Sequence, residues 1–489
     1  MSILENTPFA AAEPNDAAAI QQLRSAFDVQ RAAFANDRSP SLATRSERLQ
    51  ALIGMMAANR ERISKAVAED FGAHPVPASD LIEVLGVIGR AAYVLENLEA
   101  WMRPDERHMD AALFGSARAE VRYQPKGVIG NIVPWNFPFD LSVGPLVEML
   151  AAGNRVIIKP SEYTPACAEL LSEIIASTYD ADLVTVVNGG LELATAFSAT
   201  PWDHLLYTGS PGVGRLVMAA AAQNLTPVTL ELGGKCPAIF APGSVTAANV
   251  ESAIGTKIIK NGQMCVSVDY CMVPRSDVQT FVDEAKAFMA KAAPDYSQSS
   301  ECTGIISPCH LARIEDMLGE ARERQVNIVE LEDNGATDPQ TRRMPISLAI
   351  DPPGDLRIMQ EEIFGPILPV VPYDDLDAAI ASINAGERPL GLYIFSNDAA
   401  LADKVIADTH SGGAAVNTCA VQSALPSMGF GGSGMSGMGR HHGIEGFREF
   451  SNQRGVVVRG KGDMINGFYS PYAKAAAIVD AALSQHHQD

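Results

Sequence analysis

The chain has 489 residues, of which 47% are hydrophobic and 19% are charged. One compact core rarely grows to this size, so the length predicts two or three subdomains and excludes a single small module. With 37 basic against 58 acidic side chains, the net charge is −21. This balance disfavours nucleic-acid binding, which depends on neutralising phosphates with basic side chains.

Cysteine usage and the start of the chain indicate the compartment. The seven cysteines are an odd number without paired, metal-type spacing, which predicts a reduced, cytoplasmic setting. Met1 to Ala12 contain neither a basic segment nor an apolar run, so no secretory signal is predicted. No stretch reaches the roughly 20 apolar residues of a membrane span. The histidines, including His441 and His442, are not grouped as ligands, so no metal is predicted.

The first hundred residues have a helical pattern. From Asp16 to about Trp101, apolar residues recur every three or four positions, which predicts a helical layer against a sheet. Short apolar runs then alternate with segments of helical length, which indicates βαβ units and a parallel sheet with its ligand at the carboxyl ends of the strands. The predicted strands are Val128–Val133, Arg155–Lys159, Leu183–Val187, His204–Thr208 and Val228–Leu232.

Two of these strand ends carry residues suited to a dinucleotide. After the second strand, Lys159 and Glu162 could hold the hydroxyls of an adenosine ribose. After the fourth, a glycine-rich turn runs from Gly209 to Gly214. Ser210 suits an N-cap and Pro211 the first position of a helix, so this helix would present its N-terminus to a phosphate.

Three further residues are candidates for covalent catalysis. Cys265, after a glycine, is a candidate thiol nucleophile, and Glu231, before two glycines, is a candidate carboxylate base. Asn136 lies between Pro134 and Pro138, which fix its backbone, so its NH₂ could donate to a developing oxyanion.

Four segments in this order resemble the signature of the aldehyde dehydrogenase superfamily. Each is weak alone, but together they extend over most of the chain. They are Pro134-Trp135-Asn136-Phe137-Pro138, Glu231-Leu232-Gly233-Gly234-Lys235, Gly262-Gln263-Met264-Cys265 and Glu361-Glu362-Ile363-Phe364-Gly365-Pro366.

The resemblance implies an NAD(P)-dependent enzyme that oxidises an aldehyde to the acid through a covalent thioester. Cys265 would add to the aldehyde, Asn136 and the Cys265 N–H would hold the oxyanion, and Glu231 would activate the hydrolytic water. The turn after Thr208 would bind the pyrophosphate, although Pro211 stands where relatives commonly have an N–H donor. The predicted cofactor-binding residues are Trp135, Lys159, Glu162, Gly209, Ser210, Gly214, Glu362 and Phe364.

The same resemblance implies an α/β fold with a Rossmann-type parallel-sheet cofactor domain, a second α/β catalytic domain and a small oligomerisation extension. The expected boundaries are 1–232 for the NAD(P)-binding domain, with a β extension near 114–126, and 233–417 for the catalytic domain. Residues 418–489 would return to the cofactor domain and end in an oligomerisation tail.

Three features favour the class 3-like branch of the superfamily and hence a homodimer. The cysteine arrives early, the segment from Cys265 to Tyr270 resembles that branch, and Phe468–Lys474 resembles the tail of coniferyl aldehyde dehydrogenases. The glycine-rich run Gly429–Gly439 resembles a family segment with Ser427, Met428 and Gly429 inserted. An aromatic aldehyde such as coniferyl aldehyde, or a medium-chain aliphatic one, is the expected substrate. Because Glu162 would repel a 2′-phosphate, NAD is favoured, with NADP possible.

Three alternatives remain open at this level. A CoA-acylating or semialdehyde dehydrogenase would use the same thioester, although Glu231 favours hydrolysis. A cysteine hydrolase would need a histidine base, which no feature of the sequence nominates. A noncatalytic binding or structural protein on the same fold would not need Cys265, Glu231 and Asn136.

Overall fold

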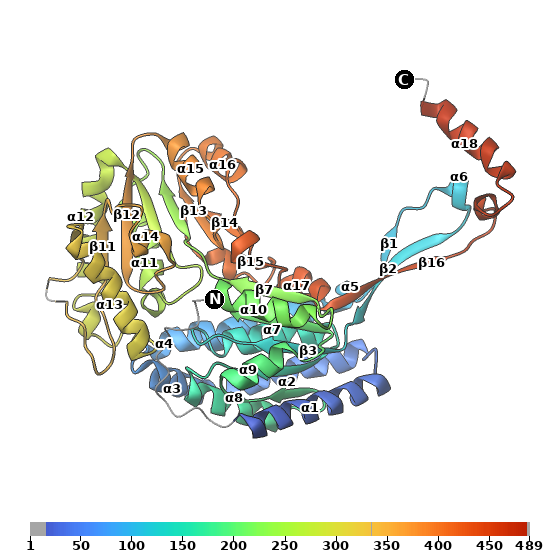
Figure 1. Ribbon diagram of the computed structural model, residues 1–489, viewed down its shortest axis with the longest axis horizontal. Coiled ribbons are helices and arrows are strands. Elements are labelled where there is room, and N and C mark those ends of the chain that lie inside the picture. Colours follow the sequence, from blue (N-terminus) through green and yellow to red (C-terminus); the bar gives the residue numbers. More distant parts are fainter. Residues whose placement is uncertain (1–15, 334, 487–489) are drawn as a thin grey trace.

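The computed structural model describes residues 16–333 and 335–486, and its first part is a six-stranded sheet (Figure 1). The strand order is β15-β7-β6-β3-β4-β5, and the five strands from β3 to β7 are parallel, which confirms the predicted parallel sheet. These strands are apolar runs whose residues are almost all buried, as expected of a sheet covered on both faces. Their bounds are β3 Val128–Ile132, β4 Arg155–Lys159, β5 Val184–Val186, β6 His204–Gly209, β7 Val228–Leu232 and β15 Gly437–Met438.

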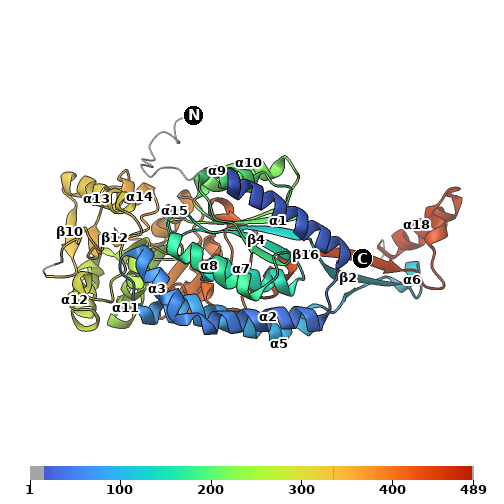
Figure 2. The ribbon, with the colours of Figure 1, turned by 90° about the horizontal axis from the view of Figure 1, so that it is seen from below.

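Helices cover both faces of this sheet (Figure 2). One face carries α1 (Ala17–Asn36), α9 (Leu191–Ser198) and α10 (Pro211–Ala222). The other face carries α7 (Asp140–Ala151) and α8 (Pro165–Thr178), and the N-terminal helices after α1 pack behind them. The predicted N-terminal helices are confirmed, but α1 and the later ones lie on opposite sides of the sheet and do not form one layer (Figure 2). The N-terminal helices are α2 Leu42–Ala58, α3 Arg60–Phe71, α4 Val76–Ser79, the π-helix η1 Asp80–Gly86 and α5 Val87–Trp101.

A seven-stranded sheet forms a second lobe, coloured yellow-green to orange in Figure 1. Its order is β10-β11-β12-β9-β8-β13-β14, with all neighbours parallel except β10 and β11. The strands are β8 Pro237–Phe240, β9 Tyr270–Pro274, β10 Asn327–Glu330, β11 Ser347–Ile350, β12 Ile367–Tyr373, β13 Gly391–Phe395 and β14 Gly413–Val416. The helices of this lobe are α11 Ala247–Ile258, α12 Val278–Ala292, α13 Pro308–Glu323, α14 Arg357–Gln360, α15 Leu376–Ala385 and α16 Ala399–Asp408.

The glycine-rich run after residue 428 returns the chain to the first sheet. Within it, β15 pairs antiparallel with β7, so that Gly437 lies opposite Glu231. A side chain at Gly437 would overlap the carbonyl oxygen of Leu230, and the backbone there has φ 140°. Glycine therefore allows close strand contact, and Gly437–Met438 join the run to the sheet. It leads into α17 (Gly443–Glu449).

An antiparallel arm projects from the body of the molecule (Figures 1 and 2). It contains β1 (Asp105–Arg107), β2 (Arg118–Pro125) and β16 (Ser451–Val458), and β2 lies within the predicted β extension. The helix α6 (Ala111–Phe114) lies at its tip, and α18 (Ala473–His486) follows at the C-terminal end. Among the described helices, none is long and apolar enough to cross a bilayer.

Candidate functional site

The candidate site lies where the carboxyl ends of β3 and β7 meet the loop that carries Cys265. Asn136 follows β3 and is 3% exposed, and Glu231 is on β7 with the same exposure. The Nδ2 atom of Asn136 donates a hydrogen bond of 3.2 Å to the carbonyl oxygen of Gln263, two residues before Cys265. The structure therefore connects the predicted oxyanion donor directly to the loop of the predicted nucleophile.

The cysteine loop has an unusual backbone. After α11 ends, three consecutive residues are left-handed: Lys260 at φ 47°, Asn261 at φ 54° and Gly262 at φ 79°. Non-glycine residues rarely adopt this conformation, so the surrounding bonds must impose it. Gln263 supplies three of those bonds, because its amide donates to the carbonyls of Lys260 and Gly304 and accepts from the Ile306 N–H.

The Phe364 turn packs against both loops. A Cβ atom at Gly262 would overlap the carbonyl oxygen of Gly365, so the two backbones are in direct contact. Phe364, with φ 50°, places its ring edge-to-face with the Trp135 ring at a centroid distance of 5.3 Å. Trp135 precedes Asn136, so the turn, the nucleophile loop and the oxyanion donor form one packed unit.

Glu362 lies against the Glu-Leu-Gly-Gly-Lys motif. A Cβ atom at Gly233 would overlap the Glu362 carboxylate. This close contact explains why a glycine stands at position 233, although its φ is not positive. Lys235 binds Asp269 at 2.5 Å and donates to the Ile358 and Glu361 carbonyls. Asp269 also accepts from the Ile363 N–H at 3.1 Å. These bonds fix the segment that carries Glu362 beside the cysteine loop.

Burial dominates the electrostatics of the site. Burial, followed by the negative charges of Glu362 and Glu231, raises the pKa of Cys265 to about 12. Burial also raises the pKa of Glu231 well above its usual value, and Arg440 only partly opposes this effect. Neither carboxylate oxygen of Glu231 has a hydrogen-bond partner among the described residues. The pKa of Glu362 is raised to about 8, chiefly by burial and then by Asp269.

Five of the predicted cofactor residues, from Lys159 to Gly214 in the sequence, lie at or just after the carboxyl ends of β4 and β6. Lys159 ends β4 and binds Glu162 at 2.9 Å. Ser210 caps α10 by accepting from the Val213 N–H, which confirms the predicted helix start. Side chains at Gly209 or Gly214 would overlap Tyr207 or Leu232, respectively. The capped helix end and close glycine backbone fit a pyrophosphate, and the Lys159–Glu162 pair offers a donor and an acceptor to a ribose.

Sequence reasoning missed the buried charges that support the site. Lys260 and Glu83 form an ion pair beneath Asn136 and are 3% and 0% exposed. Asp269, within the segment from Cys265 to Tyr270, has no role predicted from the sequence. The available signal was a lysine two residues before the nucleophile motif, since a charge in such a buried segment needs a partner.

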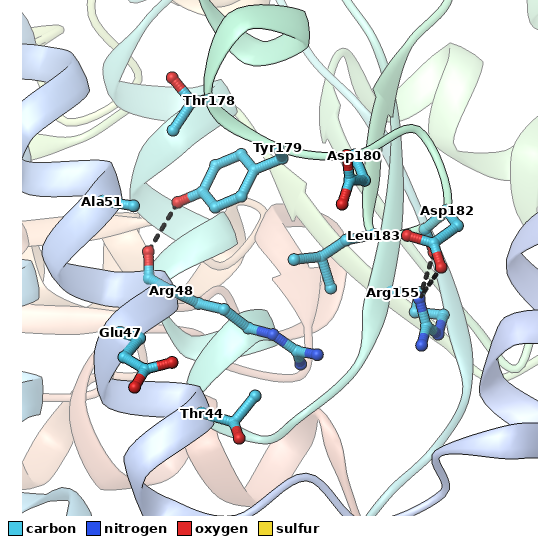
Figure 3. A pocket seen from close by; sticks show the side chains of 10 residues that line it. All are labelled: Thr44, Glu47, Arg48, Ala51, Arg155, Thr178, Tyr179, Asp180, Asp182 and Leu183. Carbon is cyan, nitrogen blue, oxygen red and sulfur yellow. Dashed lines mark hydrogen bonds and ion pairs between the residues drawn. The ribbon is translucent and has the colours of Figure 1, made fainter.

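A separate pocket lies at the opposite ends of the strands (Figure 3). Its volume is about 350 Å³, and it contains the guanidinium groups of Arg48 and Arg155. Arg155 begins β4, whereas Lys159 ends it, so this pocket is on the other edge of the sheet from Cys265. Tyr179 closes one wall by donating to the Arg48 carbonyl.

The described residues contain no group of three or more side chains suited to a metal ion.

The chain belongs to the aldehyde dehydrogenase family, whose family model matches residues 9–456. It is an NAD(P)-dependent enzyme that oxidises an aldehyde to the carboxylic acid through a covalent cysteine thioester. Both the fold class and the functional class implied by the sequence motifs are thus confirmed.

Several relatives show how similar the chain is to known members. It is 38% identical to the coniferyl aldehyde dehydrogenase of a Pseudomonas species over 460 residues, covering 93% of this chain and 95% of that protein. It is 36% identical to the mouse "Aldehyde dehydrogenase, dimeric NADP-preferring", covering 88% of this chain and 93% of the relative. The substrate-bound structure of Staphylococcus aureus AldH superposes with a TM-score of 0.88 at 31% identity, covering 94% and 99% of the two chains.

Proposed function

We propose that Cys265 is the nucleophile, Asn136 the oxyanion donor and Glu231 the base for hydrolysis. The observation that carries this assignment is the bond from the Asn136 amide to the Gln263 carbonyl. An amide NH₂ has two hydrogens, so one orients the group while the second remains available to a substrate oxygen. Sulfur addition to the aldehyde then creates the negative oxygen that this hydrogen stabilises.

Glu231 suits the second half of the reaction. Its carboxylate oxygens are buried and have no hydrogen-bond partner in the described part of the chain, so a water entering the site would become their partner. When it is ionised, a carboxylate with a raised pKa is a stronger base than an ordinary glutamate and accepts a proton from water more readily. Proton transfer from water to Glu231 while the oxygen attacks the thioester releases the acid and regenerates Cys265.

The cofactor would lie across the ends of β4 and β6. Lys159 and Glu162 would hold the adenosine ribose, Gly209, Ser210 and Gly214 the pyrophosphate, and Trp135, Glu362 and Phe364 the nicotinamide end. The bound oxidised cofactor supplies the hydride acceptor and a positive ring, which would lower the pKa of a nearby thiol. Glu162 is paired with Lys159 through one oxygen and would repel a 2′-phosphate, so NAD is the preferred form.

The substrate that we propose is an aromatic aldehyde of the coniferyl type, or a medium-chain aldehyde. Similarity to the coniferyl aldehyde dehydrogenase along nearly the whole chain supports this proposal. We assign residues 1–232 to cofactor binding, 233–417 to catalysis and 418–489 to the return segment and tail. The projecting arm and tail, with exposed Phe468 and Tyr469, support a homodimer. The free cysteines support a cytoplasmic location.

One experiment tests the catalytic assignment. The protein is mixed with coniferyl, benzyl and aliphatic aldehydes and NAD, with and without CoA, and the reduced cofactor and acid are quantified. We expect equal amounts of free acid and reduced cofactor without CoA, and loss of both in the Cys265→Ala variant. Unchanged aldehyde oxidation by that variant would refute the assignment. A requirement for CoA would identify an acylating enzyme instead.

A further inference from the structure

The ion pair between Lys260 and Glu83 lies directly beneath the candidate oxyanion donor. We propose that Lys260 is a positioning residue, which sets the Asn136 amide by binding the carbonyl oxygen of the same residue. Glu83 would anchor Lys260 in that position. This inference rests on the proposed role of Asn136 in stabilising the oxyanion.

The contacts of Lys260 are all within the buried site. Its Nζ atom lies 2.6 Å from Glu83 Oε1 and 2.6 Å from the carbonyl oxygen of Asn136. The ammonium group also lies 4.3 Å from the centroid of the Phe137 ring and 4.7 Å from that of Phe71. In this dry environment, a cation with two oxygen partners and two aromatic faces is held in one place.

Glu83 extends the same connection to the residues after Asn136. Its second oxygen accepts from the backbone N–H groups of Phe139 and Asp140, at 3.0 and 2.9 Å. Asp140 begins α7, and Glu83 itself lies on the π-helix η1. The carboxylate thus connects η1, the start of α7 and the nucleophile loop through Lys260.

Together these bonds hold Asn136 at both its backbone and its side chain. Lys260 donates to the Asn136 carbonyl, and the Asn136 amide donates back to the carbonyl of Gln263, three residues after Lys260. The left-handed backbone at Lys260 belongs to the turn that brings both groups to the same loop. With the main chain and one amide hydrogen fixed, rotation of the amide is restricted, and its second hydrogen keeps one direction.

Replacing Lys260 with methionine tests this position. We expect the single-turnover rate of hydride transfer to fall about 10- to 100-fold, because the oxyanion donor loses its orientation. The apparent affinity for NAD and the alkylation rate of Cys265 should remain within about twofold of wild type. Arg45→Met is the matched control, since Arg45 is also buried, and the hydrogen bonds of its guanidinium to the described residues go to the Pro40 and Ala151 carbonyls, away from Asn136. That variant should lose stability without slowing hydride transfer.

A double variant distinguishes positioning from general support of the fold. If Lys260 acts through Asn136, Lys260→Met should slow hydride transfer little further in an Asn136→Ala background. Equal slowing in both backgrounds, or no slowing in the wild-type background, would overturn the inference. If Asn136→Ala alone leaves hydride transfer unchanged, the proposed oxyanion role fails first. Lys260→Met/Glu83→Gln replaces the single variant if an unpaired Glu83 prevents folding.

Discussion

Alanine at Gly262 would separate the nucleophile loop from the Phe364 turn. The new methyl group would overlap the carbonyl oxygen of Gly365 by about 1 Å, measured against ordinary contact at 3.4 Å. The backbone at Gly262 has φ 79°, which an alanine adopts only at a cost. Two separate penalties therefore act at this position.

The size of the effect follows from these two penalties. A left-handed alanine costs about 1–2 kcal/mol. Overlap with a backbone atom that cannot rotate away costs about 1–3 kcal/mol more. We therefore expect the Gly262→Ala variant to lose about 2–5 kcal/mol of folding free energy. A shift of about 1 Å at Cys265 would also lower the rate of hydride transfer on the order of 100-fold.

Two other glycines separate the penalties. Gly243 has φ 76° but open space around its Cβ position, so Gly243→Ala should show only the backbone cost of about 1–2 kcal/mol. Gly255 lies within α11, also with open space, so Gly255→Ala should stabilise the helix by about 0.5–1 kcal/mol. The loss of folding free energy is measured from the midpoint of urea unfolding at a constant denaturant slope, and the effect on hydride transfer from the single-turnover rate. Equal losses for Gly262→Ala and Gly243→Ala would refute the backbone contact.

Three further predictions concern the charges of the site. Burial raises the pKa of Glu231, so its carboxylate form is lost as the pH falls, and a kcat limited by hydrolysis should rise with pH above the usual titration range of a glutamate. The check is a profile of kcat against pH for the wild type and for Glu231→Gln. A wild-type profile that is flat from pH 5 to 9 would contradict the prediction. With a Cys265 pKa of about 12, alkylation of this thiol in the free enzyme should accelerate about tenfold per pH unit between pH 7 and 10. Peptide mass spectrometry measures the alkylation rate, and a plateau of that rate near pH 8 would indicate an activated thiolate. Glu162→Ala should raise the ratio of kcat/KM for NADP to that for NAD roughly tenfold, and an unchanged ratio would show that Glu162 does not face the 2′ position.

Local patterns in the sequence determined the first sheet and its helix starts. The buried strands are short apolar runs, and such a run can be recognised in the sequence without knowledge of its distant contacts. Ser210 followed by Pro211 marked the start of α10 because capping is decided by neighbours in sequence. The same local character made the four motifs readable, and with them the enzyme family.

Tertiary structure decided how the motifs meet. Glu362 rests against Gly233, and Gly365 against Gly262, although each pair is separated by more than 100 positions in the sequence. Lys260 reaches the Asn136 carbonyl only because the chain turns left-handed before the cysteine, which residue preferences at Lys260 and Asn261 do not predict.

The protonation of the site was also decided by the fold. Sequence suggested a thiol and a carboxylate, but the low-dielectric surroundings of half-buried Cys265 and buried Glu231 raise the pKa of both. A sequence fixes which groups are present and what lies beside them along the chain. Distances across the fold and the exclusion of water depend on the packing of both lobes, so only the tertiary structure determines which of these groups hold a proton.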